Sequence, residues 1–147
     1  MIYTPLTNKA MKLAYKAHQG QLDQGGLPYI FHPLHVADQM PDEITTCVAL
    51  LHDVVEDTPV TLAELELEFP KTVTDAVRLL THDKKTDYFE YVRTLGKNPV
   101  ARTVKLADLA HNSDETRLTS CKNVSEKQID RWRKKYEKAR KILEEEE

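Results

Sequence analysis

Apolar side chains recur at helical spacing along most of the 147-residue chain, and no stretch alternates as a half-buried strand does. Proline, glycine and short polar side chains of the kinds that begin and end helices separate the apolar stretches. The pattern predicts helices over about 8–19, 32–39, 43–56, 61–68, 70–80 and 88–95, from 98 onward, and over about 126–143. We therefore expect one all-α domain over residues 1–147, a bundle of seven or eight helices.

The ends of the first helices follow from single residues. Thr7 is expected to cap the first helix and Gly20 to end it. The glycine pair and the proline of residues 21–29 predict a loop, which either lines a pocket or only connects two helices. Asp42 is expected to cap the helix over 43–56. That helix is apolar on most sides, as a helix in the middle of a bundle is.

The central helix changes character at its C-terminal end. After an apolar run, one imidazole and three carboxylates follow within six residues, at His52, Asp53, Glu56 and Asp57. An unpaired buried carboxylate costs several kcal/mol, so such groups are normally paired or bound to a metal. In a continuous helix Glu56 shares one face with His52 and Asp53. This pattern predicts a metal site with acid/base groups beside it.

Two other helices offer the missing ligands. His32 precedes Pro33 at the start of a helix, where its side chain can lean toward another element. Asp108 interrupts an apolar stretch, and His111 and Asn112 follow one turn later. Taken singly, such a histidine is more often structural, and such an aspartate can lie on an exposed face. Two imidazoles with two carboxylates suit Mn²⁺, Fe²⁺ or Zn²⁺, whereas a cysteine-free set argues against structural zinc.

The remaining polar features are expected to be solvated. His82-Asp83 repeats the dipeptide of the central helix, but two lysines follow it, which indicates an exposed helix end. The last helix has a basic face that could attract polyanions, but the tail Glu144–Glu147 argues against that. The net charge of −3 gives no sign of nucleic-acid binding.

Composition narrows the class of protein further. A chain of 147 residues can bury about 70% of the surface that its unfolded form exposes. Cys47 and Cys121 are widely spaced, which predicts reduced cysteines and a cytoplasmic protein. No apolar segment approaches the ~20 residues of a membrane span, and the N-terminus lacks the features of a signal peptide. No membrane partner is therefore expected, and the oligomeric state stays open.

Three motifs together resemble one family. They are His32-Pro33, the block Leu50–Thr58 (Leu-Leu-His-Asp-Val-Val-Glu-Asp-Thr) and the block Val104–Asn112 (Val-Lys-Leu-Ala-Asp-Leu-Ala-His-Asn). In this order they resemble the hydrolase domain of RelA/SpoT proteins, within the HD phosphohydrolase superfamily. The resemblance extends from about residue 17 to residue 117. Because 147 residues leave no room for a synthetase domain, the chain most resembles the stand-alone small alarmone hydrolases, which include a metazoan SpoT homologue.

The resemblance implies an HD-type helical domain and a mostly Mn²⁺-dependent enzyme. Such an enzyme removes pyrophosphate from the 3′ position of (p)ppGpp by means of a metal-activated water. By this resemblance the metal ligands are His32, His52, Asp53 and Asp108. Glu56 and Asp57 would position or deprotonate the water, and Asn112, Tyr29 and Gln21 would contact the substrate.

One position departs from the family's pattern. The family's loop carries an arginine that packs on the guanine base, and Asp23 stands at that place here. An aspartate cannot stack as a guanidinium does, and it repels phosphate. Beside the (p)ppGpp hydrolase, this keeps open an HD phosphohydrolase acting on a different nucleotide or phosphorylated metabolite. A third alternative is a non-catalytic nucleotide-binding module. Whether segment 84–97 closes over the pocket also stays open.

Overall fold

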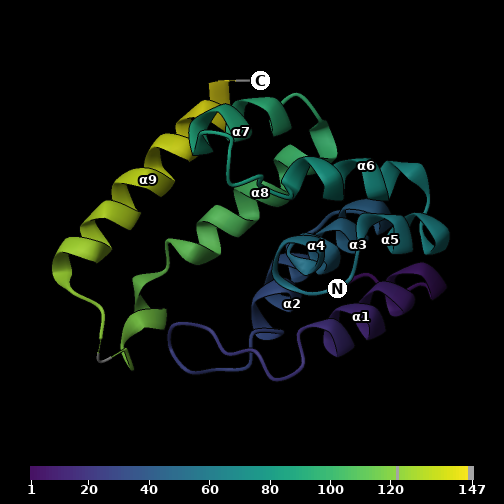
Figure 1. The fold of residues 1–147 in the computed structure, drawn as a ribbon, viewed down its shortest axis with the longest axis horizontal. Coiled ribbons are helices and arrows are strands. Elements are labelled where there is room, and N and C mark those ends of the chain that lie inside the picture. The colour runs from purple at the N-terminus through teal and green to yellow at the C-terminus, as the bar shows by residue number, and fades with distance from the viewer. Residues whose placement is uncertain (122, 146–147) are drawn as a thin grey trace.

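The computed structural model describes residues 1–121 and 123–145, and these residues form helices without a strand. Eight helices have seven residues or more, and Figure 1 shows how they are arranged. They are α1 (Pro5–Ala17), α2 (Phe31–Asp38), α3 (Glu43–Leu51), α5 (Leu62–Glu68), α6 (Lys71–Leu80), α7 (Tyr88–Leu95), α8 (Pro99–Asn112) and α9 (Glu126–Glu145). The single turn α4 (Val54–Asp57) and the 3-10 helix η1 (Glu115–Leu118) complete the fold. The all-α prediction is confirmed.

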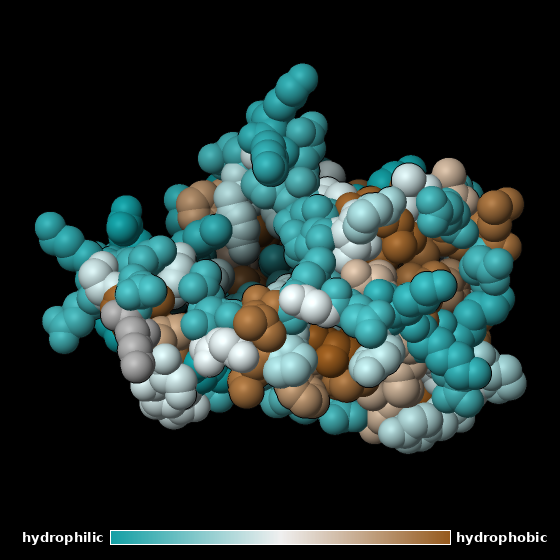
Figure 2. Space-filling model, turned by 60° about the horizontal axis from the view of Figure 1, so that its bottom comes forward, coloured by the Kyte–Doolittle hydropathy of each residue, from teal (hydrophilic) through white to brown (hydrophobic). Residues whose placement is uncertain are grey.

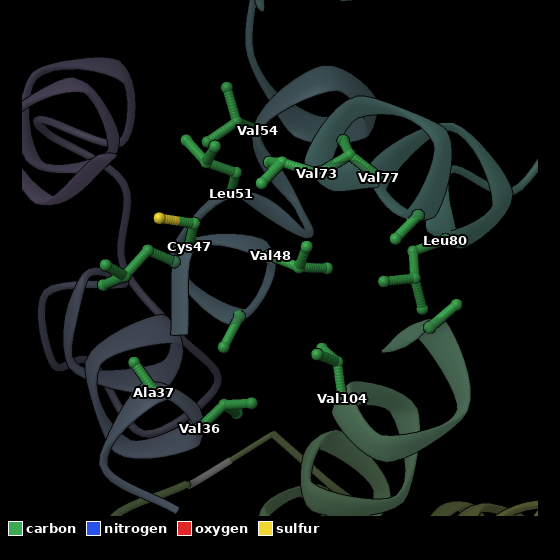
Figure 3. Close-up of a cluster of buried hydrophobic side chains, with 14 of the residues drawn as sticks. Val36, Ala37, Cys47, Val48, Leu51, Val54, Val73, Val77, Leu80 and Val104 are labelled. Atoms are coloured by element: carbon green, nitrogen blue, oxygen red, sulfur yellow. The ribbon is translucent and has the colours of Figure 1, made fainter. Parts of the chain in front are cut away.

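Helix α3 is the centre of the core. It packs against α1, α2, α6 and α8, and its residues 45–51 are all buried. Figure 3 shows Val48 on α3 pointing toward the space between Val77 of α6 and Val104 of α8. Cys47 is buried in the same core, and neither it nor Cys121 forms a disulfide within the part of the chain that the structure describes. Because α3 is buried, its packing fixes the position of His52 and Asp53, which follow it directly.

Helix α1 begins earlier than expected. Its cap is Thr4, whose side chain accepts a hydrogen bond from the backbone N–H of Thr7 at 3.1 Å, so the prediction of Thr7 as the cap is wrong. Thr7 instead completes a reciprocal capping box, because its hydroxyl oxygen accepts from the backbone N–H of Thr4. Pro5 suits the first helical position. Gly20, with a φ of +88°, lies in the turn just beyond the end of α1.

The helix predicted over 43–56 is broken. Helix α3 ends at Leu51, α4 begins at Val54, and His52 and Asp53 form the junction. The ring Nδ1 of His52 lies 2.5 Å from the carbonyl oxygen of Ala49, which a continuous helix would offer to the backbone N–H of Asp53. The premise of a continuous helix behind the one-face argument is therefore wrong, because His52 ends α3 whereas Glu56 belongs to α4, for which Asp53 is the N-cap residue.

The C-terminal half covers one side of this core. In Figure 1, α9 runs beside α7 and α8, and it packs against both. Asn98 caps α8, with its side chain accepting from the backbone N–H of Ala101 at 3.0 Å, as its Asn-Pro start predicts. Among the described helices none is both long enough and apolar enough to cross a membrane. Residues 146 and 147 of the acidic tail lie outside the described residues.

Candidate metal centre

Four side chains from three parts of the chain meet at the junction between α3 and α4. Nε2 of His32 lies 2.8 Å from Oδ1 of Asp108 and 3.8 Å from Oδ2 of Asp53. Nε2 of His52 lies 3.0 Å from Oδ2 of Asp53 and 3.6 Å from Oδ1 of Asp108. His32, His52 and Asp108 are each less than 5% exposed. The structure thus brings together the four residues expected to be metal ligands.

The protonation pattern of His52 fits a bound cation. Its Nδ1 must carry a proton, because its partner is the carbonyl oxygen of Ala49, which only accepts. In the neutral ring Nε2 then has a lone pair, and this buried atom makes no hydrogen bond among the described residues, because its neighbour at 3.0 Å is a carboxylate oxygen of Asp53, which also only accepts. Ligand atoms of His32, His52 and Asp53 all lie within 4.8 Å of one another. Lone pairs and carboxylates that converge away from water are stabilised by a cation, so the donor set suits a divalent metal.

Asp108 is held by two neighbours on its own helix. Its Oδ2 accepts from the ammonium of Lys105 at 2.9 Å, and its Oδ1 accepts from the side-chain amide of Asn112 at 3.0 Å. Burial alone would raise the pKa of Asp108, but Lys105 and the histidine partners outweigh it and hold the pKa well below its usual range. Asp108 is therefore ionised.

Tyr29 orients Asp53. The phenol of Tyr29 donates a 2.6 Å hydrogen bond to Oδ2 of Asp53. Burial and the Asp53 carboxylate raise the pKa of Tyr29, so it remains a donor. Burial would raise the pKa of Asp53, but His52 outweighs this and lowers it. The expected contact of Tyr29 with substrate stays a prediction, and this hydrogen bond gives Tyr29 a role toward a candidate ligand.

The four candidate ligands line a cavity with a volume of about 230 Å³, the metal cavity. The expected acid/base residues Glu56 and Asp57 line it as well. Oε1 of Glu56 accepts a 2.7 Å hydrogen bond from the backbone N–H of His82. Burial, followed by the charges of Asp53 and Glu56, raises the pKa of Asp57 to about 6. Glu56 and Asp57 thus line the metal cavity although the helix between them and His52 is broken.

Several residues of this metal cavity were not expected from the sequence. His82 lines it, so the prediction of a wholly solvated end after α6 is wrong for His82. Lys135 also lines it, with Nζ 4.2 Å from the centre of the Tyr88 ring, so the basic face of α9, although solvent-exposed as predicted, borders the cavity at this residue. Lys105 lies near Tyr88 as well, at 5.7 Å from the ring centre. The sequence signal for these residues was weak, because surface helices commonly carry lysines.

A larger cavity of about 460 Å³ adjoins the first. It lies between loop 22–25, the end of α8, η1 and α9. Figure 2 shows a hollow on this face of the molecule with both hydrophilic and hydrophobic residues at its edge. The two cavities share the side chains Tyr29, His32, Asn112 and Tyr136. A molecule in the larger cavity, the side cavity, can therefore reach the cluster directly.

Asp23 folds the loop that forms one wall of the side cavity. Its Oδ1 accepts hydrogen bonds from the backbone N–H groups of Gly25 at 2.9 Å and Leu27 at 3.0 Å. Its Oδ2 lies 3.6 Å from Nη2 of Arg117, which reaches the same cavity from η1. A Cβ on Gly25 would lie 2.8 Å from the carbonyl oxygen of Arg117, so the two elements approach closely there. The negative charge of Asp23 is offset inside the cavity by a guanidinium.

Two expected substrate contacts have partners within the protein. The amide of Gln21 donates to the carbonyl oxygen of Asp57 at 2.8 Å and accepts from Nδ1 of His18 at 2.8 Å. Gln21 therefore ties the loop to α4, and its contact with substrate stays a prediction. Asn112 lines both cavities while its amide bonds to Asp108, so its predicted contact with substrate also stays open.

The chain is similar to known proteins over most of its length. The bifunctional (p)ppGpp synthase/hydrolase SpoT of Escherichia coli (strain K12) is 38% identical over 119 residues, covering 71% of this chain and 17% of SpoT. The GTP pyrophosphokinase rsh of Brucella melitensis is 38% identical over 122 residues, covering 73% and 16%. The chain thus spans about a sixth of the length of these curated relatives.

A solved structure of a metazoan orthologue of SpoT, reported to hydrolyse ppGpp and to act in starvation responses, superposes with a TM-score of 0.76 at 25% identity. The match covers 99% of this chain and 96% of that one. The family model of the HD domain matches residues 10–143. The chain belongs to the HD domain family.

Proposed function

We propose that the chain is a divalent-metal-dependent hydrolase that removes pyrophosphate from the 3′ position of (p)ppGpp, with Mn²⁺ as the native ion and Fe²⁺ or Zn²⁺ as alternatives. One observation carries the proposal: a cluster of two imidazoles and two carboxylates lines a cavity of about 230 Å³, and this cavity shares four side chains with an adjoining cavity of about 460 Å³. That volume lies in the range of small-molecule sites.

The chemistry of the metal cavity supports hydrolysis. An ion bound by His32, His52, Asp53 and Asp108 would supply Lewis acidity, which lowers the pKa of water and stabilises charge on phosphate. Asp57 borders the same cavity and its pKa is raised to about 6, which suits a group that takes a proton near neutral pH. Glu56 is held by the backbone of His82 and can orient the water.

Two lysines that line the metal cavity suit a pyrophosphate group. Lys105 and Lys135 both line the metal cavity, and each lies over the ring of Tyr88. Burial and the neighbouring Lys105 lower the pKa of Lys135, as expected for two ammonium groups near one another. An anionic group between them relieves that repulsion.

The side cavity suits the nucleoside. Its walls combine the rings of Trp132 and Tyr136 with the guanidinium of Arg117. Two N–H edges of Arg117 are directed at the carbonyl oxygen of His111 and at Asp23, which leaves the flat face of the guanidinium for a base. Arg117 thus offers the kind of surface that an aspartate at position 23 does not.

A second candidate function is supported by the same pair. Because Asp23 and Arg117 offset each other, the side cavity differs in charge from one lined by a free arginine. An HD phosphohydrolase with such a cavity could act on a different nucleotide. The rates at which the protein hydrolyses ppGpp and a panel of other nucleotides distinguish the two candidate functions.

The test measures pyrophosphate release from ppGpp by the native protein with Mn²⁺, beside a panel of other nucleotides and with Asp53→Asn as the matched inactive control. We expect Mn²⁺-dependent release that the variant lacks. Turnover of other nucleotides but not of ppGpp supports the second candidate, whereas nucleotide binding without turnover indicates a non-catalytic module. Metal analysis of the purified protein identifies the ion.

The wider context stays part of the proposal. The partner is a small nucleotide. Two points stay predictions: the cytoplasmic location, which is inferred from the two cysteines, and the single domain over residues 1–147. The proposal includes no nucleic-acid or membrane partner.

A further inference from the structure

The imidazole of His32 meets a second imidazole on the side away from the cluster. Its Nδ1 lies 2.8 Å from Nδ1 of His111, whereas its Nε2 faces Asp108. The two ring planes differ by 5°, and the ring centres are 5.1 Å apart. The distance between the ring centres equals the sum of the two centre-to-nitrogen distances and the 2.8 Å contact only when the two Nδ1 atoms point straight at each other and the rings lie in one plane. This is the geometry of a linear N–H···N hydrogen bond and not of a face-to-face stack.

His111 makes two further contacts, one through its ring and one through its backbone. His35, one turn after His32 on α2, stacks on its face, with ring centres 3.8 Å apart and planes 14° apart. The backbone carbonyl oxygen of His111 accepts a hydrogen bond from Arg117 at 3.0 Å. Neither contact uses Nδ1 of His111, so that atom stays directed at His32.

The hydrogen bond decides which nitrogen of His32 can bind a cation. A neutral imidazole has one N–H and one lone pair, so Nε2 can be a ligand only when the proton is on Nδ1. His32 is 3% exposed, and its Nδ1–H then needs an acceptor inside the protein. Nδ1 of His111 is at hydrogen-bond distance. We propose that His111 is a positioning residue that accepts the Nδ1 proton of His32 and so directs the lone pair of Nε2 at the metal.

The two histidines of the cluster are therefore held differently. The carbonyl oxygen of Ala49 only accepts, so it fixes the tautomer of His52 by itself. His111 can accept or donate, so the His32–His111 pair has two arrangements. In the second, His111 donates and the proton of His32 is on Nε2, where Asp108 at 2.8 Å accepts it. A bound cation selects the first arrangement, because it needs that lone pair.

Matched variants test the inference, which rests on the proposed metal site. The affinity for Mn²⁺ alone is measured from the EPR signal of the free ion for wild type, His111→Asn and His111→Phe. Oδ1 of asparagine can replace the acceptor, whereas phenylalanine keeps a ring and removes the acceptor. We expect Mn²⁺ to bind about 10–100-fold more weakly to His111→Phe, the usual cost of losing a partner of a metal-ligating histidine. His111→Asn is expected to stay close to wild type.

A purely structural role of His111 predicts the opposite order, because only phenylalanine keeps a ring against His35. Unfolding temperatures without metal show how far each variant is destabilised. Wild-type affinity in His111→Phe, or an affinity in His111→Asn as low as in His111→Phe, overturns the inference.

A measurement on the wild-type protein makes the result independent of how the variants fold. In the ¹⁵N-labelled, Zn²⁺-loaded protein, we expect one proton on Nδ1 of His32 with a nitrogen–nitrogen coupling across the hydrogen bond to Nδ1 of His111. A proton on Nδ1 of His111, or no such coupling, overturns the inference and leaves the proposed function intact. If wild type binds neither Mn²⁺ nor Zn²⁺, the proposed function fails, and this inference fails with it.

Discussion

Replacing Lys105 by methionine is expected to destabilise the metal-free protein strongly. The ammonium of Lys105 lies 2.9 Å from Oδ2 of Asp108, and the two side chains are 12% and 6% exposed. Methionine keeps the apolar stem but leaves the carboxylate of Asp108 without its cation. Removing one partner of a buried ion pair costs about 3–5 kcal/mol. We expect a loss of this size in the free energy of unfolding in EDTA.

A divalent ion should reduce this loss. In the Lys105→Met protein, the ion supplies the positive charge that Asp108 lacks, and the more negative site attracts the ion more strongly. The loss in saturating Mn²⁺ should therefore be smaller than the loss in EDTA by about 1 kcal/mol or more, since one pair of charges near a protein surface is worth about 4 kcal/mol at 4 Å. The substitution thus makes the free energy of unfolding depend more strongly on the bound ion.

Urea unfolding of wild type and variant, each in EDTA and in saturating Mn²⁺, measures both effects. The matched control is Lys134→Met, because Lys134 is 76% exposed and pairs with Asp130 at 3.0 Å on the surface. An exposed pair contributes under about 1 kcal/mol, with or without the ion. The reasoning is refuted if Lys105→Met behaves like Lys134→Met in EDTA, or if Mn²⁺ leaves its loss unchanged.

Three other outcomes follow from the structure. Mn²⁺ at 100 times its dissociation constant should stabilise wild type by about 2.7 kcal/mol in thermal unfolding, and Asp53→Asn should lose most of this gain. Arg117→Ala should raise the KM for the nucleotide about tenfold with little change in kcat, since stacking on a base contributes about 1–3 kcal/mol. The control Arg133→Ala, which removes an exposed ion pair with Glu115, should change neither constant. Leu50→Ala in α3 should cost about 2–5 kcal/mol in urea unfolding, whereas Leu67→Ala, at a side chain that is 86% exposed, should cost under about 0.5 kcal/mol.

Three of the four candidate ligands could be found from the sequence because a charged group in an apolar run has a free-energy cost that is visible locally. His52 and Asp53 end an apolar run and Asp108 interrupts one, and a charge in such a run needs a partner wherever the helices pack. The break after Leu51 could not be found in this way. Hydrophobic periodicity records which side chains are buried, and it does not record that a ring nitrogen of His52 takes the carbonyl group of Ala49.

Several residues that line the cavities could not be predicted from the sequence, for a different reason. Lys105 lies on α8 and Lys135 is one of several exposed basic residues of α9, and only the packing of α9 on α7 and α8 brings these two toward one space. The pairing of Asp23 with Arg117 joins a loop to a 3-10 helix far along the chain. Such pairs depend on tertiary contacts that a single sequence does not carry.

The loop after α1 is attached to the candidate metal centre at two points. Tyr29, at its end, donates to a carboxylate of the cluster, and Gln21, near its start, donates to the last residue of α4. Ordering of this loop by a bound base therefore also restrains Asp53, and a bound ion restrains the loop. Thermodynamic linkage then requires reciprocity: whatever factor the ion adds to nucleotide affinity, the nucleotide adds to ion affinity. We expect ion and nucleotide to bind with positive cooperativity, so the concentration of free metal in the cell sets the concentration of nucleotide to which this protein responds.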